Sequence, residues 1–96
     1  MQAPALLDYL VELAREAGIR VRVIPRSSAE LDLAPHSGIC RIRGSLWLLL
    51  VSAESLEDRI EAAATVVRAH ASEVLEGRYL PPAVRERLEC PQGKLP

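Results

Sequence analysis

The order of apolar and polar positions predicts a helix and then a strand at the start of the chain. Residues 4–17 repeat leucine and alanine at three- and four-residue spacing, the pattern of an amphipathic helix, and Gly18 follows where helices commonly end. Residues 19–24 alternate isoleucine and valine with Arg20 and Arg22, which is the two-residue period of a half-buried strand. A loop rich in serine and proline follows the strand.

Residues 39–51 predict two strands joined by a tight turn, which must therefore be antiparallel. With a two-residue loop, either Arg43-Gly44 or Gly44-Ser45, the alternation divides the side chains between two faces in the same way. One face then carries Cys40, Ile42, Trp47, Leu49 and Val51, and the other carries Ile39, Arg41, Arg43, Leu46, Leu48 and Leu50. We expect the Trp47 face to form the core beneath the helices.

Two further helices are expected in the second half of the chain. Residues 55–76 carry a continuous apolar stripe that begins with Ser-Leu-Glu-Asp, a sequence similar to a helix capping box, and Gly77 closes this long helix. A short helix follows Pro81-Pro82 and extends to about Glu89.

The predicted order α-β-β-β-α-α indicates an α+β fold in a single domain over residues 1–90, with a flexible C-terminal tail at residues 91–96. A small three-stranded sheet, at least partly antiparallel, carries the two long helices and the short C-terminal helix. The partner and the direction of the first strand stay open, because its connecting loop is long enough to run either way.

Composition excludes several classes of protein. The longest apolar run, Leu46 to Val51, is far shorter than the roughly 20 residues that cross a bilayer. The N-terminus has no basic segment before its apolar residues, so we expect no signal peptide and a cytoplasmic location. Two cysteines, Cys40 and Cys90, are too few for the disulfide framework of a small secreted domain.

The motifs of enzymes are missing from the sequence. There is no glycine-rich phosphate loop and no Gly-x-Ser-x-Gly, and neither Cys-x-x-Cys nor His-Glu-x-x-His occurs. We therefore expect no catalytic residue, no cofactor and no bound metal. The minor alternative is a metal-dependent enzyme that uses His36, Cys40 and His70, with Cys90 as a further potential zinc ligand.

The formal net charge of −1 indicates no general affinity for polyanions, but the charges are unevenly distributed. Arg20, Arg22, Arg41 and Arg43 would share one sheet face if both strands keep their alternation and pair suitably. Such a face can contact phosphates, so a nucleic-acid-binding accessory domain is the second hypothesis for function. The chain has only three aromatic residues, Tyr9, Trp47 and Tyr79, for stacking on bases.

The strand at residues 46–51 is apolar on both faces, and this favours a partner. Burying a leucine side chain contributes about 1.5–3 kcal/mol, so three exposed leucines would be costly. We expect a partner surface on this face of the hairpin, formed by Arg41, Arg43, Leu46, Leu48 and Leu50. The partner is either another protein or a second copy of the chain, which would form a homodimer. The leading hypothesis is therefore a non-enzymatic cytoplasmic interaction or self-association protein.

Four segments, at residues 38–44, 46–51, 55–60 and 79–88, resemble a group of small bacterial proteins that has no assigned activity. The chain is also similar to the front of minimal zinc-peptidase domains, in which a helix, a strand, a hairpin and a long helix follow one another. In those domains the long helix holds the zinc motif. The corresponding residues here, 62–71, lack it, so this second resemblance implies a non-catalytic relative.

Overall fold

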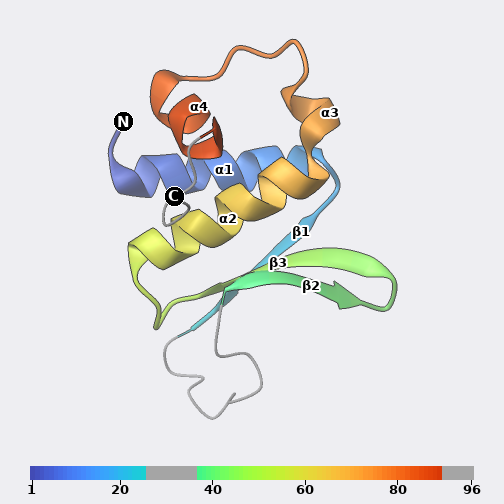
Figure 1. The fold of residues 1–96 in the computed structure, drawn as a ribbon. Helices are drawn as coiled ribbons and strands as arrows, with labels where there is room; N and C mark the ends of the chain where they lie inside the picture. Colours follow the sequence, from blue (N-terminus) through green and yellow to red (C-terminus); the bar gives the residue numbers. More distant parts are fainter. Residues whose placement is uncertain (26–36, 90–96) are drawn as a thin grey trace, which may run out of the picture.

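A three-stranded sheet is covered on one face by helices (Figure 1). The computed structural model describes residues 1–25 and 37–89, so the predicted tail at residues 91–96 lies outside the described residues. The elements are α1 (Ala3–Glu16), β1 (Arg20–Ile24), β2 (Gly38–Ile42), β3 (Ser45–Val51), α2 (Leu56–His70), α3 (Ser72–Leu75) and α4 (Pro82–Glu89). The predicted α+β class is confirmed.

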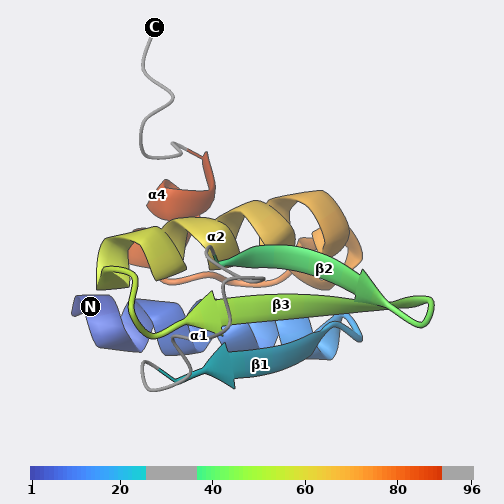
Figure 2. The same ribbon diagram turned by 90° about the horizontal axis from the view of Figure 1, so that it is seen from below.

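Strand β3 lies at the centre of the sheet, in the order β1-β3-β2 (Figure 2). It pairs antiparallel with β2, as the tight turn predicted, and parallel with β1, which the sequence left open. The turn consists of Arg43 and Gly44, whose φ angles of 51° and 82° are both positive, as in a type I′ hairpin turn. A central strand has its neighbours on both edges and packs on at least one face, which agrees with the apolar character of β3.

The helices cover the leucine face of β3, and the prediction that they cover the Trp47 face is wrong. Leu48 is 0% exposed and Leu50 is 4% exposed, and both belong to the main core. The register confirms the division of the strand side chains between two faces, because Trp47 pairs with Cys40 and Leu48 pairs with Ile39. Arg43 is the exception, since it was predicted on the leucine face but lies in the turn and lines a hollow together with Trp47.

A physical reason for this choice lies in the side chains themselves. The leucine face of β3 is purely aliphatic, whereas the indole N–H of Trp47 needs a polar partner when it is buried. Arg41 does not prevent burial of the leucine face, because it lies near the end of the hairpin, which projects beyond the helices (Figure 2). There the aliphatic stem of an arginine can cover apolar surface while its guanidinium stays in water.

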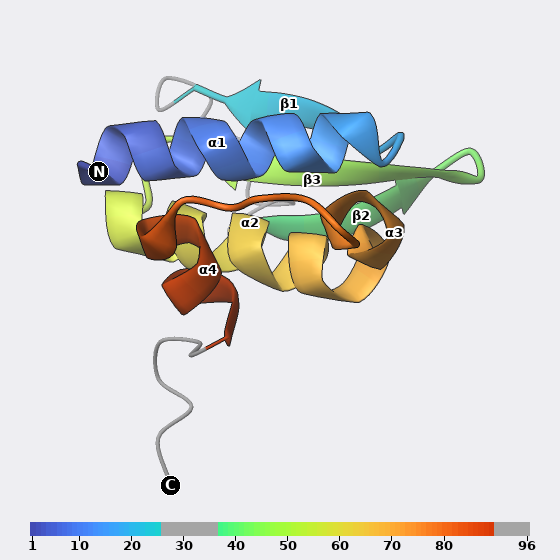
Figure 3. The same cartoon turned by 90° about the horizontal axis from the view of Figure 1, so that it is seen from above.

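Helices α1 and α2 pack side by side on the sheet, α1 on β1 and α2 on β2 and β3. Helix α4 packs on α1 and α2 from the side opposite the sheet (Figure 3) and buries Val84 and Leu88 there. The predicted short C-terminal helix is therefore confirmed. The core between the layers contains the fully buried side chains of Leu10, Leu13, Leu48, Ile60, Val67 and Val84.

Helix α1 ends as the sequence predicts, at Gly18. The Gly18 N–H donates to the carbonyl of Arg15 at 2.9 Å, and the Ile19 N–H donates to the carbonyl of Ala14 at 3.0 Å. This is the bonding of a Schellman motif, which requires the left-handed backbone that Gly18 adopts at φ 86°. The motif turns the chain directly into β1 and places Ile19 in the core.

The long helix expected over residues 55–76 begins as predicted but is broken. Its start is capped by Ser55, whose hydroxyl accepts the Asp58 N–H at 3.0 Å. It ends at His70, because Ala71 leaves helical geometry with φ −123° and ψ 25°, and α3 follows as a separate turn. Helix α2 with its 15 residues and strand β3 with its 7 residues have similar lengths, roughly 22–23 Å.

Candidate functional site

The face of the sheet turned away from α1 and α2, which we call the outer face, is the candidate site. Within residues 1–25 and 37–89 every helix lies on the opposite side of the sheet (Figure 1). The pairing places Arg20, Trp47 and Cys40 in one row across the outer face. The next row contains Arg22 beside Leu49.

The accessible half of the outer face is the half nearest the hairpin turn. At the other end Ile24 and Val51 are paired and both are buried. Towards the turn, Trp47 and Leu49 are only half-buried, and Arg20 and Arg22 are exposed. A ligand therefore meets the outer face around Trp47.

Trp47 and Arg20 interact directly across β3 and β1. The guanidinium carbon of Arg20 lies 5.5 Å from the centre of the indole ring, within the range of a cation–π contact. Beside this pair is a shallow depression of about 410 Å³. Its lining consists of Arg20, Ile42, Arg43, Ser45 and Trp47. One aromatic ring, two guanidinium groups and a hydroxyl thus surround one hollow.

The outer face is positively charged. Arg20 and Arg22 project from β1, and Arg43 occupies the turn at its rim. None of the three described strands carries an acidic residue. The described acidic residues lie instead on the helices, on the β3–α2 loop and, for Glu76, on the α3–α4 linker. Within the described residues, therefore, no carboxylate on the strands offsets these positive charges.

The structure separates residues that the sequence predicted to lie together, both in the partner surface and in the set of arginines for nucleic acid. The expected partner surface does not form, because Leu48 and Leu50 are buried beneath the helices. Arg41 pairs with Leu46 on the helix side of the sheet, so it is not on the same face as Arg20 and Arg22. Of the four arginines proposed to contact nucleic acid, three gather around the outer face: Arg20, Arg22 and Arg43.

Sequence reasoning missed Trp47 as a site residue, because it assigned the indole to the core. The signal that identifies it is chemical. A strand with a choice between an all-leucine face and a face bearing an indole N–H gains more by burying the leucines. Once that face is chosen, the alternation of β1 brings Arg20 and Arg22 beside Trp47 and Leu49.

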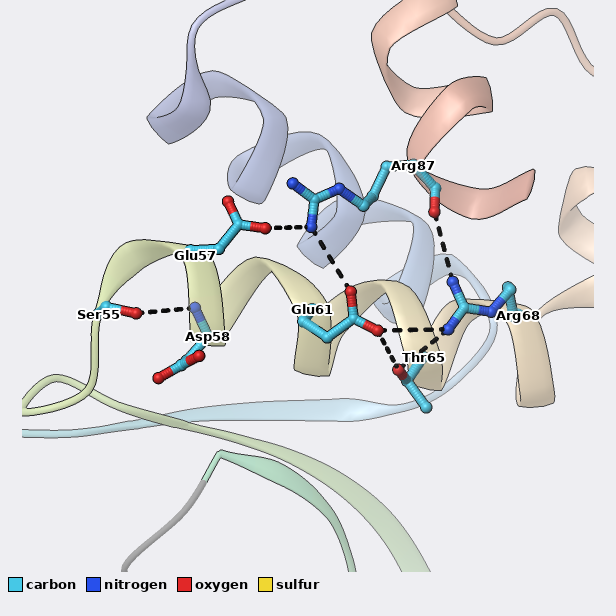
Figure 4. Close-up of polar contacts among 7 residues, drawn as sticks. All are labelled: Ser55, Glu57, Asp58, Glu61, Thr65, Arg68 and Arg87. Carbon is cyan, nitrogen blue, oxygen red and sulfur yellow. Dashed lines mark hydrogen bonds and ion pairs between the residues drawn. The ribbon is translucent and has the colours of Figure 1, made fainter. Parts of the chain in front are cut away.

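A second polar cluster joins α2 to α4 (Figure 4). Arg87 Nη1 lies 2.5 Å from Glu57 Oε2 and 3.5 Å from Glu61 Oε1. Arg68 donates through Nη1 to the Arg87 carbonyl at 3.4 Å, and its Nη2 lies 3.7 Å from Glu61 Oε2. The same Nη2 donates to Thr65 Oγ1 at 3.1 Å.

This cluster holds the two helices together. Glu61 and Arg68 are charged side chains of α2, but they are only 28% and 26% exposed, and α4 packs on this helix. The hydrogen bond to Glu57 raises the pKa of Arg87, and the negative charges of Glu57 and Glu61 add to this effect against the cost of burial. All members of the cluster are paired with one another, which is the arrangement of a structural contact.

The residues proposed for a metal site do not lie together in the part of the chain that the structure describes. Cys40 lies on the outer face, whereas His70 is exposed at the end of α2 on the other side of the sheet. His36 and Cys90 lie outside the described residues. In the described ranges no three His, Cys, Asp or Glu side chains are close enough to hold a metal ion. The α2 segment that corresponds to the zinc motif of the peptidases buries Val66 and Val67 in the core.

No protein-family model, curated protein or solved structure matches this chain. Its resemblance to the small bacterial proteins therefore stays a prediction. Among the helices of the described part, none combines the length and the apolar character needed to cross a bilayer.

Proposed function

We propose that this chain is a non-enzymatic, cytoplasmic interaction module that binds an anionic partner through the outer face of its sheet. The observation that carries this proposal is the charge of that face, where Arg20, Arg22 and Arg43 are exposed and the strands have no acidic residue. Guanidinium groups bind carboxylate and phosphate oxygens through two parallel hydrogen bonds. The partner is therefore a molecule that presents several such groups.

Two polar groups outside the exposed part of the outer face form structural contacts, which accords with a binding role for that face. Ser37 lies at the end of the sheet, where its hydroxyl accepts the Val51 N–H at 2.8 Å and its own N–H donates to Glu54 Oε1 at 2.6 Å. These bonds extend the pairing of β2 with β3 by one step, so the serine ties the sheet together. The cluster around Arg87 is likewise occupied in joining α2 to α4.

Self-association through the outer face is disfavoured by the same charges. Two copies placed face to face would bring Arg20, Arg22 and Arg43 against their own counterparts, which is repulsive in a symmetric contact. Alternating arginines along β1 also protect that edge of the sheet against pairing with another β1. Light scattering at micromolar concentration checks this point, and we expect a particle of 10.5 kDa.

The proposal is tested by removing charge from the outer face alone. The triple variant R20A/R22A/R43A removes three arginines there, and the control R15A/R78A/R85A removes three exposed arginines from the helices and the α3–α4 linker. Arg15 and Arg78 pair with Glu12 and Glu16 at the surface, and such pairs contribute little to stability.

Binding of polyphosphate, polyglutamate and a single-stranded oligonucleotide is measured at about 50 mM salt, where electrostatic binding is strong. We expect at least one of these polyanions to bind the wild type and the control, and to lose affinity for the outer-face variant. Equal loss in both triple variants would contradict the proposal, because the effect would then follow net charge and not this face. Absence of binding to all three polyanions would contradict it as well.

A further inference from the structure

The depression beside Trp47 has a chemistry that a simple polyanion site does not require. An acidic peptide or polyphosphate needs the guanidinium groups of Arg20 and Arg43, but it gains nothing specific from an indole ring. Here the ring of Trp47 forms part of the lining, together with both guanidinium groups and the Ser45 side chain. An aromatic surface next to two cations matches a ligand that carries an aromatic ring and a phosphate group a few bonds apart.

The position of the depression leaves it accessible. It lies at the hairpin end of the sheet, and Figure 2 shows this end projecting beyond β1 and the helices. Trp47 is half-buried, so its indole is anchored among the strands while part of the ring remains exposed. Arg22 extends the positive charge along β1, at a distance from Arg20 of roughly 6.6 Å for two residues of strand.

The backbone of Arg43 is a second and independent sign that this position is used. The residue has φ 51°, a left-handed conformation that costs a residue other than glycine about 1–2 kcal/mol. A hairpin turn with two positive φ angles favours Asn-Gly, Asp-Gly or Gly-Gly. The chain instead places an arginine there, directly beside the depression, and such strain tends to occur at binding sites.

We propose that this depression binds one nucleotide of a single-stranded nucleic acid. The base stacks on the indole of Trp47, and the phosphates adjacent to it pair with Arg20 and Arg43. Arg22 then meets the next phosphate along β1. This inference rests on the proposed function, because it assigns the chemical class of the anionic partner of the outer face.

The free energies of the two contacts allow a base to displace the Arg20 guanidinium from the ring of Trp47. An exposed cation–π contact such as that of Arg20 with Trp47 is worth about 0.5–1 kcal/mol, whereas stacking a base on an aromatic side chain is worth about 1–3 kcal/mol. Because Arg20 is exposed, its long side chain can turn from the ring to a phosphate. The guanidinium thereby exchanges one favourable contact for another when the nucleotide binds.

Single strands fit this site better than duplex. The bases of a duplex are stacked on one another and cannot stack on an indole at the face of a sheet, whereas those of a single strand are available for stacking. The prediction for duplex DNA is therefore weaker binding than for a single strand of the same length.

The chain supplies its own reporter for the test, since Trp47 is its only tryptophan. An oligothymidylate of about ten nucleotides, a typical site size for a small domain, is titrated into the wild-type protein. We expect saturable quenching of tryptophan fluorescence. The logarithm of the affinity should fall with the logarithm of salt concentration at a slope of about −2, the value for three phosphate contacts on a single strand.

Variants are compared with a labelled oligothymidylate by fluorescence anisotropy, which does not need the tryptophan. Replacing Trp47 by leucine should weaken binding about 5- to 150-fold, the loss of one stacked base. Because W47L also alters the sheet, R43A provides a second variant at an exposed turn, and it should weaken binding and reduce the salt slope by about 0.7. The matched control is R41A, which removes an exposed arginine from the same hairpin on the opposite face and should bind as the wild type does.

The outcomes separate this inference from the proposed function. Binding of oligothymidylate that R43A weakens and R41A preserves supports it, provided that an abasic oligomer of the same length binds more weakly. If polyglutamate or the abasic oligomer binds as tightly as oligothymidylate, the outer face is an anion site without base recognition, and only the inference is overturned. If none of these polyanions binds, the inference and the proposed function both fail.

Discussion

Arg20 and Trp47 occupy paired positions on adjacent parallel strands, and the guanidinium carbon of Arg20 lies 5.5 Å from the centre of the indole ring. This contact results from two independent features of the sequence. Alternation along β1 places arginine at every second position, and the choice of the leucine face for the core leaves Trp47 on the same side of the sheet as those arginines.

Replacing Arg20 by alanine should lower the free energy of unfolding by about 0.5–1 kcal/mol, the value of an exposed cation–π contact. The control is R22A, which removes the same side chain two residues along β1, where the neighbour across β3 is Leu49. Urea denaturation followed by circular dichroism measures both variants. An equal change in the two would indicate that the contact with Trp47 does not contribute.

Truncating two neighbouring leucines should reveal which face of β3 is the core. L48A removes a side chain with no exposure and should destabilise by about 2–5 kcal/mol, through lost burial and the cavity left behind. L49A removes a half-buried side chain on the outer face and should cost about 1 kcal/mol or less. Guanidinium denaturation midpoints compare the two, and a larger loss for L49A would mean that the core lies on the other face.

Removing Arg87 should loosen α4 from α2. R87A removes the closest cation from Glu61 Oε1 and leaves this half-buried carboxylate with Arg68 and Thr65, so we expect a loss of about 1–3 kcal/mol. R85A, on the exposed side of the same helix, should change stability by less than about 0.5 kcal/mol. Thermal unfolding measures both.

The contribution of Arg87 should also be independent of pH across the neutral range. Its pKa is raised in the folded protein, so the stabilisation is fully present below the ordinary pKa of arginine and would be lost only as the pH rises through the still higher folded value. A difference between wild type and R87A that changes between pH 6 and 9 would point to a titrating partner in place of a constant ion pair.

Replacing Arg43 by asparagine should stabilise the fold and weaken the site at once. Asparagine tolerates a positive φ and is the preferred first residue of this turn, so we expect a gain of up to about 1 kcal/mol. The comparison is R41N in β2, where asparagine is a poor strand residue and should slightly destabilise. Chemical denaturation of both variants tests the opposite signs. A stability gain without any loss of polyanion binding would show that the strained arginine is not used for binding.

Much of the fold is contained in short-range pattern. The strand around Arg20 and Arg22, the helix start at Ser55 and the helix end at Gly18 each depend on neighbours a few residues away, and all three appear where they were expected. Two details differ, because Val23 is exposed in β1 and the helix that begins after Ser55 ends at His70. The same short-range rule divided the side chains of the two hairpin strands correctly into two sets, although Arg43 lies in the turn beside Trp47 and not in the leucine set.

The candidate site on the outer face, in contrast, is formed by contacts between segments that are distant in the chain. The alternation of side chains along β3 predicts which of them share a face, but it does not predict which of the two faces the helices cover. That choice depended on the all-leucine set being fully apolar and on Arg41 reaching solvent near the end of the hairpin. The parallel pairing of β1 with β3 likewise brought Arg20 to Trp47 across 27 positions of sequence, and no local pattern encodes the partner of an edge strand. Periodicity is therefore a property of the chain itself, whereas burial of one face and exposure of the other are decided only when helices and sheet exclude water together.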